Sequence, residues 1–319
     1  MRSLVTGADG FVGQWLIRAL LDAGEEVTGM TRADHARFTT LDVKSATAVR
    51  WLCADLLDPQ ALSAVVKAAQ PEVVYHLAAQ ASVAASLRDP AGTVETNVVG
   101  TANLLETLRT DAAHATVITV GSAEAYGDVA PSELPIREET VLRPNNPYAG
   151  SKAAAEVLAL QYAQSGWLRV VATRSFNHTG PGQSTAFAAA AFANQFADIA
   201  RGKQAPTLAH GNLSAQRDFL DVRDVVAAYH LLATRGRPGT AYNVCSGRAV
   251  SMRQIVESLG RLVGRPVELR EDPARMRPID TPVIVGDASL IRRDTGWEPT
   301  IPLERTLQDL YEYFLNEAG

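Results

Sequence analysis

A tyrosine and a lysine four positions apart form the most specific chemical signature in this sequence. Tyr148 and Lys152 make a Tyr-x-x-x-Lys pattern, and residues with this spacing lie on one face of a helix. A phenol has an ordinary pKa of about 10, and a neighbouring ammonium can stabilise its phenolate. Ser122 follows the strand-like run 116–120 and could hydrogen-bond the same substrate oxygen. These residues predict proton transfer at a carbonyl or alcohol oxygen.

Three glycines near the start of the chain predict a phosphate-binding turn. Gly7, Gly10 and Gly13 lie between the strand-like run 3–6 and a helical pattern over residues 11–23. Residues without a side chain let backbone N–H groups approach a pyrophosphate, and the helix N-terminus adds partial positive charge. We therefore expect this turn to bind a dinucleotide.

The end of the second strand-like run, 26–30, indicates which dinucleotide. An NAD-selective site usually has a carboxylate here, whereas an arginine accommodates a 2′-phosphate. The sequence has Arg32 and no carboxylate at this point. NADP(H) is therefore the expected cofactor, with a solvated loop charge as the alternative reading of Arg32.

Strand-like and helical segments alternate through the first half. This alternation predicts an α/β fold, a doubly wound parallel sheet of the Rossmann type, over residues 1–175. The expected strands are 3–6, 26–30, 49–52, 73–77, 116–120 and 168–172, and the expected helices are 11–23, 59–69, 93–108 and 151–165.

The second half, residues 176–319, predicts a smaller C-terminal substrate-binding lobe. Segments near 219–245 are expected to return to the first domain. Here the expected helices are 186–201, 222–234 and 251–263, the expected strand is 241–244, and residues 271–282 read as irregular chain.

Composition excludes several classes of protein. The 319 residues are 46 % hydrophobic and 20 % charged, with 30 basic and 35 acidic side chains giving a net charge of −5. These values exclude a disordered chain or a fibre, and no basic stripe indicates a nucleic-acid partner. We find no signal-peptide pattern, no apolar run that could span a membrane and no histidine spacing typical of a metal site. Cys53 and Cys245 stand in apolar surroundings, which favours a cytoplasmic protein with reduced, buried thiols.

Several motifs together resemble the extended short-chain dehydrogenases/reductases, and the resemblance runs along essentially the whole chain. They occur in the order of that superfamily: Gly7-x-x-Gly10-x-x-Gly13, Asp55-Leu56, Leu77-Ala78-Ala79, Asn97, Ser122, Tyr148-x-x-x-Lys152 and Arg217-Asp218. Within it, the stretches 177–183, 211–222 and 272–277 resemble the GDP-4-keto-6-deoxy-D-mannose reductases, which are related to the GDP-mannose 4,6-dehydratases.

This resemblance implies a role for each candidate residue. The catalytic group would be Ser122, Tyr148, Lys152 and Glu124. Asn97 would support the active-site helix and its water. The NADP(H) site would comprise Gly7, Gly10, Phe11, Val12, Gly13, Arg32, Asp55, Leu56, Leu77, Ala78, Ala79, Tyr148 and Lys152. The GDP-linked deoxyhexose would contact Gln80, Ser122, Glu124, Asn177, Arg217 and Arg277, and no metal is expected.

The implied reaction is NADPH-dependent reduction of a 4-keto sugar nucleotide to GDP-D-rhamnose by a homodimer that pairs segments 93–108 and 151–165 with their mates. A GDP-mannose 4,6-dehydratase is the main alternative, followed by a sugar-nucleotide 4-epimerase and a non-catalytic NADP(H) sensor. By the same resemblance, a dehydratase would carry Thr-Asp-Glu or Thr-Ser-Glu at the position where this chain has Ser122-Ala123-Glu124. The sequence favours the reductase.

Overall fold

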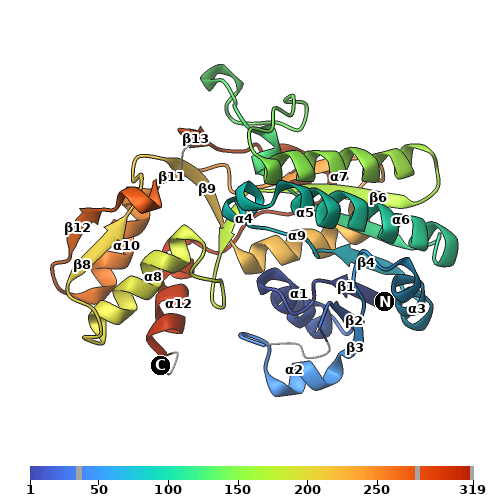
Figure 1. Cartoon of the computed structure of the whole chain (residues 1–319), viewed down its shortest axis with the longest axis horizontal. Helices are drawn as coiled ribbons and strands as arrows, with labels where there is room; N and C mark the ends of the chain where they lie inside the picture. The colour runs from blue at the N-terminus through green and yellow to red at the C-terminus, as the bar shows by residue number, and fades with distance from the viewer. Residues whose placement is uncertain (34–37, 277–280, 317–319) are drawn as a thin grey trace.

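A seven-stranded parallel sheet forms the centre of the computed structural model, which describes residues 1–33, 38–276 and 281–316 (Figure 1). Its order is β10-β6-β5-β4-β1-β2-β3. The chain winds outward from β1 in both directions, which confirms the predicted doubly wound fold and places the switch point between β1 and β4. The strands are β1 (Arg2–Thr6), β2 (Glu26–Thr31), β3 (Arg50–Cys53), β4 (Val73–His76), β5 (Thr116–Ser122), β6 (Arg169–Ser175) and β10 (Ala241–Val244).

Helices cover both faces of this sheet. One face carries α1 (Phe11–Asp22) and α9 (Val222–Arg235), and the other carries α3 (Pro59–Ala69), α6 (Gly100–Asp111) and α7 (Pro147–Gln164). All four residues of β4 are buried, as expected for a strand that is covered on both sides. The peripheral α2 (Val43–Ala48) lies near β3 (Figure 1).

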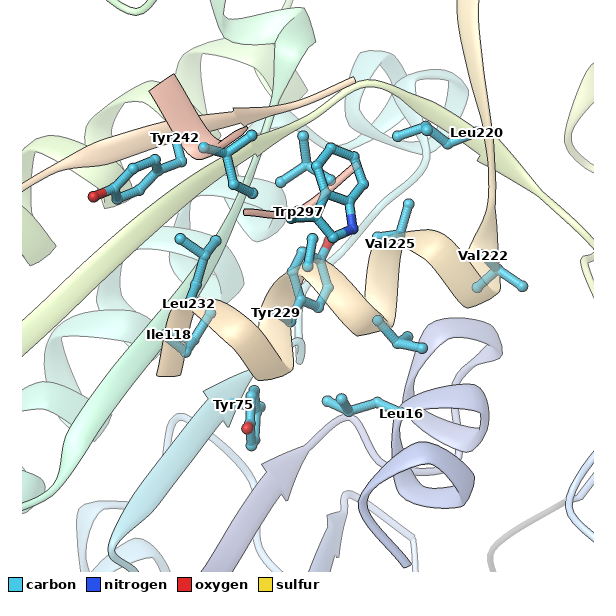
Figure 2. Close-up of a cluster of buried hydrophobic side chains, with 14 of the residues drawn as sticks. Leu16, Tyr75, Ile118, Leu220, Val222, Val225, Tyr229, Leu232, Tyr242 and Trp297 are labelled. Atoms are coloured by element: carbon cyan, nitrogen blue, oxygen red, sulfur yellow. The ribbon is translucent and has the colours of Figure 1, made fainter. Parts of the chain in front are cut away.

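The core on the α1–α9 side joins the sheet to the C-terminal part of the chain. Figure 2 shows Leu16 of α1, Tyr75 of β4 and Tyr229 of α9 in this core, with Trp297 lying over α9. The indole nitrogen of Trp297 donates to the carbonyl of Asp224 at 3.0 Å. Each fully buried apolar side chain of this kind stabilises the fold by about 1.5–3 kcal/mol.

The segment predicted as one helix over residues 93–108 is divided in the structure. It consists of α5 (Pro90–Val94), a π-helical turn η1 (Glu95–Val99) and α6. A short helix, α4 (Val83–Arg88), precedes it, and single turns η2 (Ala123–Tyr126) and η3 (Pro131–Glu133) follow β5. Turns of the π type frequently occur at functional sites, and η1 contains Asn97.

A second group of elements surrounds its own apolar cluster. Helices α8 (Ala188–Ala200), α10 (Met252–Val263) and α12 (Leu303–Asn316) pack together there. Strand β9 (Gln216–Asp221) pairs with β7 (Asn177–Thr179), β11 (Ala249–Ser251) and β13 (Val283–Ile284), whereas β8 (Thr207–His210) pairs with β12 (Glu268–Glu271). The turn η4 (Pro273–Arg275) and helix α11 (Ser289–Thr295) complete the fold. Across the described ranges, no helix is both long and apolar enough to cross a membrane.

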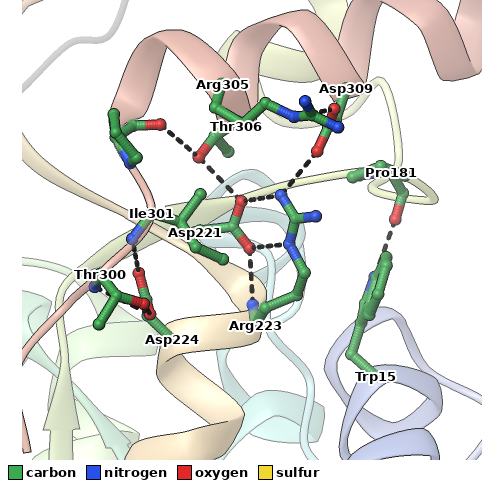
Figure 3. Close-up of polar contacts among 11 residues, drawn as sticks. Trp15, Pro181, Asp221, Arg223, Asp224, Thr300, Ile301, Arg305, Thr306 and Asp309 are labelled. Atoms are coloured by element: carbon green, nitrogen blue, oxygen red, sulfur yellow. Dashed lines mark hydrogen bonds and ion pairs between the residues drawn. The ribbon is translucent and has the colours of Figure 1, made fainter.

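Buried carboxylates connect the start of α9 to the C-terminal segment (Figure 3). Asp221 accepts hydrogen bonds from Arg223 and from the hydroxyl of Thr306, and Arg223 also pairs with Asp309 at 2.7 Å. Asp224 similarly accepts bonds from residues 300 and 301. Buried charges are stable when they are paired and hydrogen-bonded, so this cluster fixes α12 to the end of β9 and the start of α9.

Candidate active site

The turn after β1 has the geometry of a phosphate cradle. Gly7 has a φ of 66°, and a Cβ on it would lie 2.9 Å from the backbone of Ala78. A Cβ on Gly13 would lie 2.4 Å from the carbonyl oxygen of Gly7. No side chain caps α1, and its first turn contains no acidic residue. Its free N–H groups and positive end can therefore receive an anion.

The rim beside this turn holds the residues expected to contact adenosine. Arg32 is exposed just after β2, and Asp55 is exposed after β3, where its carboxylate accepts the N–H of Leu57 at 2.9 Å. Leu56 is buried.

Cys53 is exposed at the end of edge strand β3, so the expectation that both thiols are buried is wrong for Cys53. Phe11 and Val12 are half-buried at the start of α1.

Tyr148, Lys152 and Ser122 come together at the carboxyl edge of the sheet. Ser122 ends β5, and Tyr148 lies in the first turn of α7, nearly buried with 9 % of its surface exposed. Burial raises the pKa of Tyr148 to about 12, and the charge of Glu124 adds to this effect, whereas a hydrogen bond with the Ser122 side chain opposes it. The sequence predicts that the Lys152 ammonium lowers this pKa, but desolvation of the phenol is the dominant effect in the structure. The phenol is therefore protonated at neutral pH.

Lys152 lies on the same face of α7, one turn after Tyr148. Its ammonium donates to the carbonyl oxygen of Val120 at 2.8 Å, which directs it against β5. Burial lowers the pKa of Lys152 to about 8. One helix therefore presents a proton donor and a cation side by side.

The loop after β4 lines the same edge. Leu77, Ala78 and Ala79 are half-buried, and the N–H of Ala78 donates to Thr6 at 3.1 Å. Asn97 exchanges two hydrogen bonds with the backbone of Gln80, at 2.7 and 3.0 Å. Asn97 thus fixes the loop against the π-helical turn.

A histidine that the sequence analysis did not single out lies beneath Lys152. His76 is hydrogen-bonded through both ring nitrogens: the Thr6 hydroxyl, which also accepts from Ala78, lies 2.9 Å from Nδ1. Thr101 donates to a carbonyl and so accepts from Nε2 at 3.0 Å. Burial, and then the charge of Lys152, lower the pKa of His76 from 6.5 to about 3.

We predict that His76 makes the fold sensitive to acid. Its pKa is depressed on folding, so the unfolded chain binds a proton below pH 6.5 that the native chain takes up only near pH 3. Stability should therefore fall as the pH is lowered through this window, by about 3 kcal/mol at about pH 4. Urea unfolding at several pH values would measure this loss.

A matched pair of variants isolates this effect. His76→Asn should be less stable at neutral pH but should lose less stability on acidification than the unmodified chain. The exposed His114 provides the control, because His114→Asn should leave the acid sensitivity unchanged. An identical acid slope in His76→Asn and in the unmodified chain would contradict the assignment.

A small cavity of about 20 Å³ lies between His76 and Lys152, and Thr119 lines it. This volume suffices for one water molecule. The Thr119 hydroxyl is buried and has no hydrogen-bond partner among the described residues. A strand-interior threonine is unremarkable in sequence, so nothing could have indicated its position here.

The proposed substrate contacts occupy different environments. Glu124 is half-buried in η2, next to Ser122, and Asn177 is exposed at the start of β7. The Gln80 side chain is engaged internally, since it donates to Thr93 at 2.9 Å and accepts from Ser82. Arg217 is 5 % exposed and donates to two backbone carbonyls, those of residues 216 and 281. Arg277 lies outside the described residues.

A second contact that the sequence did not predict joins the glycine turn to the second group of elements. The ring of Phe11 stacks on His178, with centroids 6.3 Å apart and planes inclined by 7°. His178 donates from Nδ1 to the carbonyl of Phe176 at 2.9 Å. In the ranges that the structure covers, no cluster of metal-ligating side chains is present.

Comparison with known proteins agrees with this geometry. The family described as GDP-mannose 4,6 dehydratase matches residues 4–310. GDP-6-deoxy-D-mannose reductase of Pseudomonas aeruginosa is 39 % identical over 96 % of this chain and 95 % of that protein. UDP-glucose 4-epimerase of Mycolicibacterium smegmatis is 31 % identical over the full length of both chains. The solved structure of RMD from Pseudomonas aeruginosa complexed with NADPH superimposes with a TM-score of 0.87, at 35 % identity and with complete coverage of both chains.

The parallel sheet, the glycine turn and the Ser-Tyr-Lys group define an extended short-chain dehydrogenase/reductase, as the motifs predicted. Within that class, the chain belongs to the GDP-mannose 4,6 dehydratase family.

Proposed function

We propose that this chain is an NADPH-dependent reductase of a GDP-4-keto-6-deoxyhexose, namely GDP-4-keto-6-deoxy-D-mannose, and that its product is GDP-D-rhamnose. The observation that carries the proposal is the meeting of three side chains at the carboxyl edge of the sheet: Ser122 at the end of β5, and Tyr148 and Lys152 one turn apart on α7. The NADPH-bound solved structure and the reductase with 39 % identity support it. The direct test is consumption of one NADPH for each keto sugar, with the product identified by NMR.

The residues divide the reaction between them. Bound NADPH supplies a hydride to the C4 carbonyl carbon. The Tyr148 phenol donates its proton to the carbonyl oxygen as negative charge develops there, and the Ser122 hydroxyl orients that oxygen. The Lys152 ammonium stabilises the resulting phenolate and holds the nicotinamide ribose. Arg217 and Arg277 would face the diphosphate, whose oxygens match a guanidinium.

The cradle residues fit the pyrophosphate of the cofactor, because Gly7 and Gly13 leave no room for a Cβ and α1 begins without a cap. Arg32 is exposed directly after β2, and an arginine at the end of this strand can accommodate a 2′-phosphate. We expect Arg32→Ala to reduce the preference for NADPH over NADH by about 10- to 100-fold, the loss of one charged hydrogen bond. Fluorescence titration of both cofactors measures this preference.

Arg50→Ala is the matched control for that experiment. Arg50 is also exposed, but it lies at the opposite end of the neighbouring strand β3. Arg50→Ala should leave the affinities for NADPH and for NADH unchanged. Equal affinity of the unmodified protein for NADH and NADPH would refute the role of Arg32.

A homodimer is the assembly that we propose. Exposed apolar side chains gather on α4, α5, η1 and α7: Leu87 is 54 % exposed, Val94 45 %, Val99 47 % and Val157 64 %. These elements lie against one another, so a second copy placed on them would form a four-helix interface. No disulfide joins Cys53 to Cys245, which is compatible with a cytoplasmic location.

Light scattering at micromolar concentration should give twice the chain mass of 34.1 kDa. Val157→Glu places a charge in the middle of the interface and should give monomers. Val43→Glu, at an 81 % exposed valine on α2, should remain dimeric. A monomeric unmodified protein would contradict this assembly.

A further inference from the structure

The backbone N–H of Tyr148 is bonded by a serine from a different helix. Ser86 on α4 is fully buried, and its hydroxyl oxygen accepts this N–H at 3.1 Å. The same hydroxyl donates to the carbonyl of Val83 at 2.8 Å, so the orientation of its lone pairs is fixed. The two partners are 62 residues apart in sequence.

The position of Tyr148 in its helix makes this bond important. The first N–H groups of a helix have no partner within it, and the first turn is where helices fray. Pro147 has no N–H, and Asn146 accepts the N–H groups of Ala149 and Gly150. Tyr148 alone in this turn depends on a distant element.

The carbonyl side of Tyr148 is also held. Ser151 donates to that carbonyl at 2.8 Å and accepts from Asn97 at 2.8 Å. Farther along α7, Glu156 pairs with Arg174 of β6 at 2.7 Å, both nearly buried. The body of the helix is therefore anchored to the sheet, and Ser86 holds the one N–H of the first turn that Asn146 does not accept.

We propose that Ser86 is a positioning residue for the chemical step, acting through the backbone of Tyr148; this rests on the proposed role of Tyr148 as the proton donor. Proton transfer requires the phenol oxygen within hydrogen-bond reach of the carbonyl oxygen. A first turn free to fray would move that oxygen. Ser86 thus contributes to the rate of the reaction and not to the binding of either ligand.

Ser86→Ala tests this role against a purely structural one. We expect kcat to fall about tenfold or more, because misplacement of a catalytic group by about 1 Å costs up to 10²-fold. KM and the Kd for NADPH should change by less than about twofold, since no ligand contact is removed. Cysteine is close to serine in size and its sulfur is a weak acceptor, so the kcat of Ser86→Cys should lie between those of Ser86→Ala and the unmodified protein.

Ser82→Ala is the matched control, because Ser82 caps the same helix α4 by accepting the N–H of Ala85 at 3.2 Å but does not contact Tyr148. It should keep kcat near that of the unmodified enzyme. Equal losses of kcat in the two alanine variants would overturn the proposal. If Ser86→Ala does not fold, Ser86→Cys replaces it in the comparison.

Amide hydrogen exchange at Tyr148 gives a readout that does not depend on turnover. Exchange should accelerate about tenfold or more in Ser86→Ala and remain slow in Ser82→Ala. Unchanged protection in Ser86→Ala would overturn the inference even in an active enzyme. If the unmodified protein lacks reductase activity but the variants show this exchange pattern, the proposed function is refuted, whereas the inferred backbone contact stands.

Discussion

Tyr148→Phe is expected to lower kcat at least about 100-fold while leaving NADPH affinity nearly unchanged, because general acid catalysis contributes about 10²- to 10⁴-fold. Only the hydroxyl is removed, and the ring keeps its place among buried neighbours. Burial raises the pKa of Tyr148 to about 12, so the group lost is a phenol that carries its proton at neutral pH. Steady-state kinetics and fluorescence titration together separate the chemical step from binding.

Tyr162→Phe supplies the control on the same helix. The Tyr162 hydroxyl donates to Glu106 at 3.2 Å, far along α7 from the reacting group. This variant should retain most of the activity, which excludes a general effect of losing a phenol from α7. More than about a tenth of the original kcat in Tyr148→Phe would be incompatible with Tyr148 as the acid.

The parts of the site that could be predicted are those with a local signal. Tyr148 and Lys152 share a helix, so their spacing alone places both on one face. Ser122 and the glycine turn follow buried strands, and parallel strands bring their carboxyl ends to one edge. Local spacing and sheet topology were together sufficient to place these groups at the same edge.

Contacts between distant segments had no such signal. The bond from Ser86 to Tyr148, the His76 network and the cavity beside Thr119 depend on how α4, β4 and α6 approach one another. The π-helical turn depends likewise on the contact between Asn97 and the loop at Gln80. Tertiary contacts of this type override local propensity, which is why the helix expected over 93–108 is divided.

One omission was avoidable. Helix α12 was not predicted, although Leu307, Leu310, Tyr311 and Phe314 recur at helical spacing and are all buried. By contrast, β7, β11 and β13 have only three, three and two residues. Strands this short show no alternation that a pattern could detect.

The choice between reductase and dehydratase depends on the residues after β5. A 4,6-dehydratase must oxidise C4, remove the C5 proton, expel the C6 hydroxyl as water and return the hydride to C6. The Glu124 carboxylate could act as a base, but Ala123 is a buried methyl group that cannot donate or relay a proton. Carbonyl reduction needs only the hydride, Tyr148 and Ser122. The family includes dehydratases by its description, so this difference has to be tested on the chain itself.

We therefore expect stoichiometric NADPH oxidation with GDP-4-keto-6-deoxy-D-mannose and little or no water elimination when GDP-mannose is supplied with NADP⁺. Glu124→Gln sharpens the comparison. A reductase should lose less than about tenfold in kcat, because no proton passes through Glu124, whereas loss of a general base costs about 10²- to 10⁴-fold. NMR of the sugar products follows both reactions in parallel. Efficient conversion of GDP-mannose to the 4-keto-6-deoxy sugar without net NADPH consumption, abolished by Glu124→Gln, would identify a dehydratase instead.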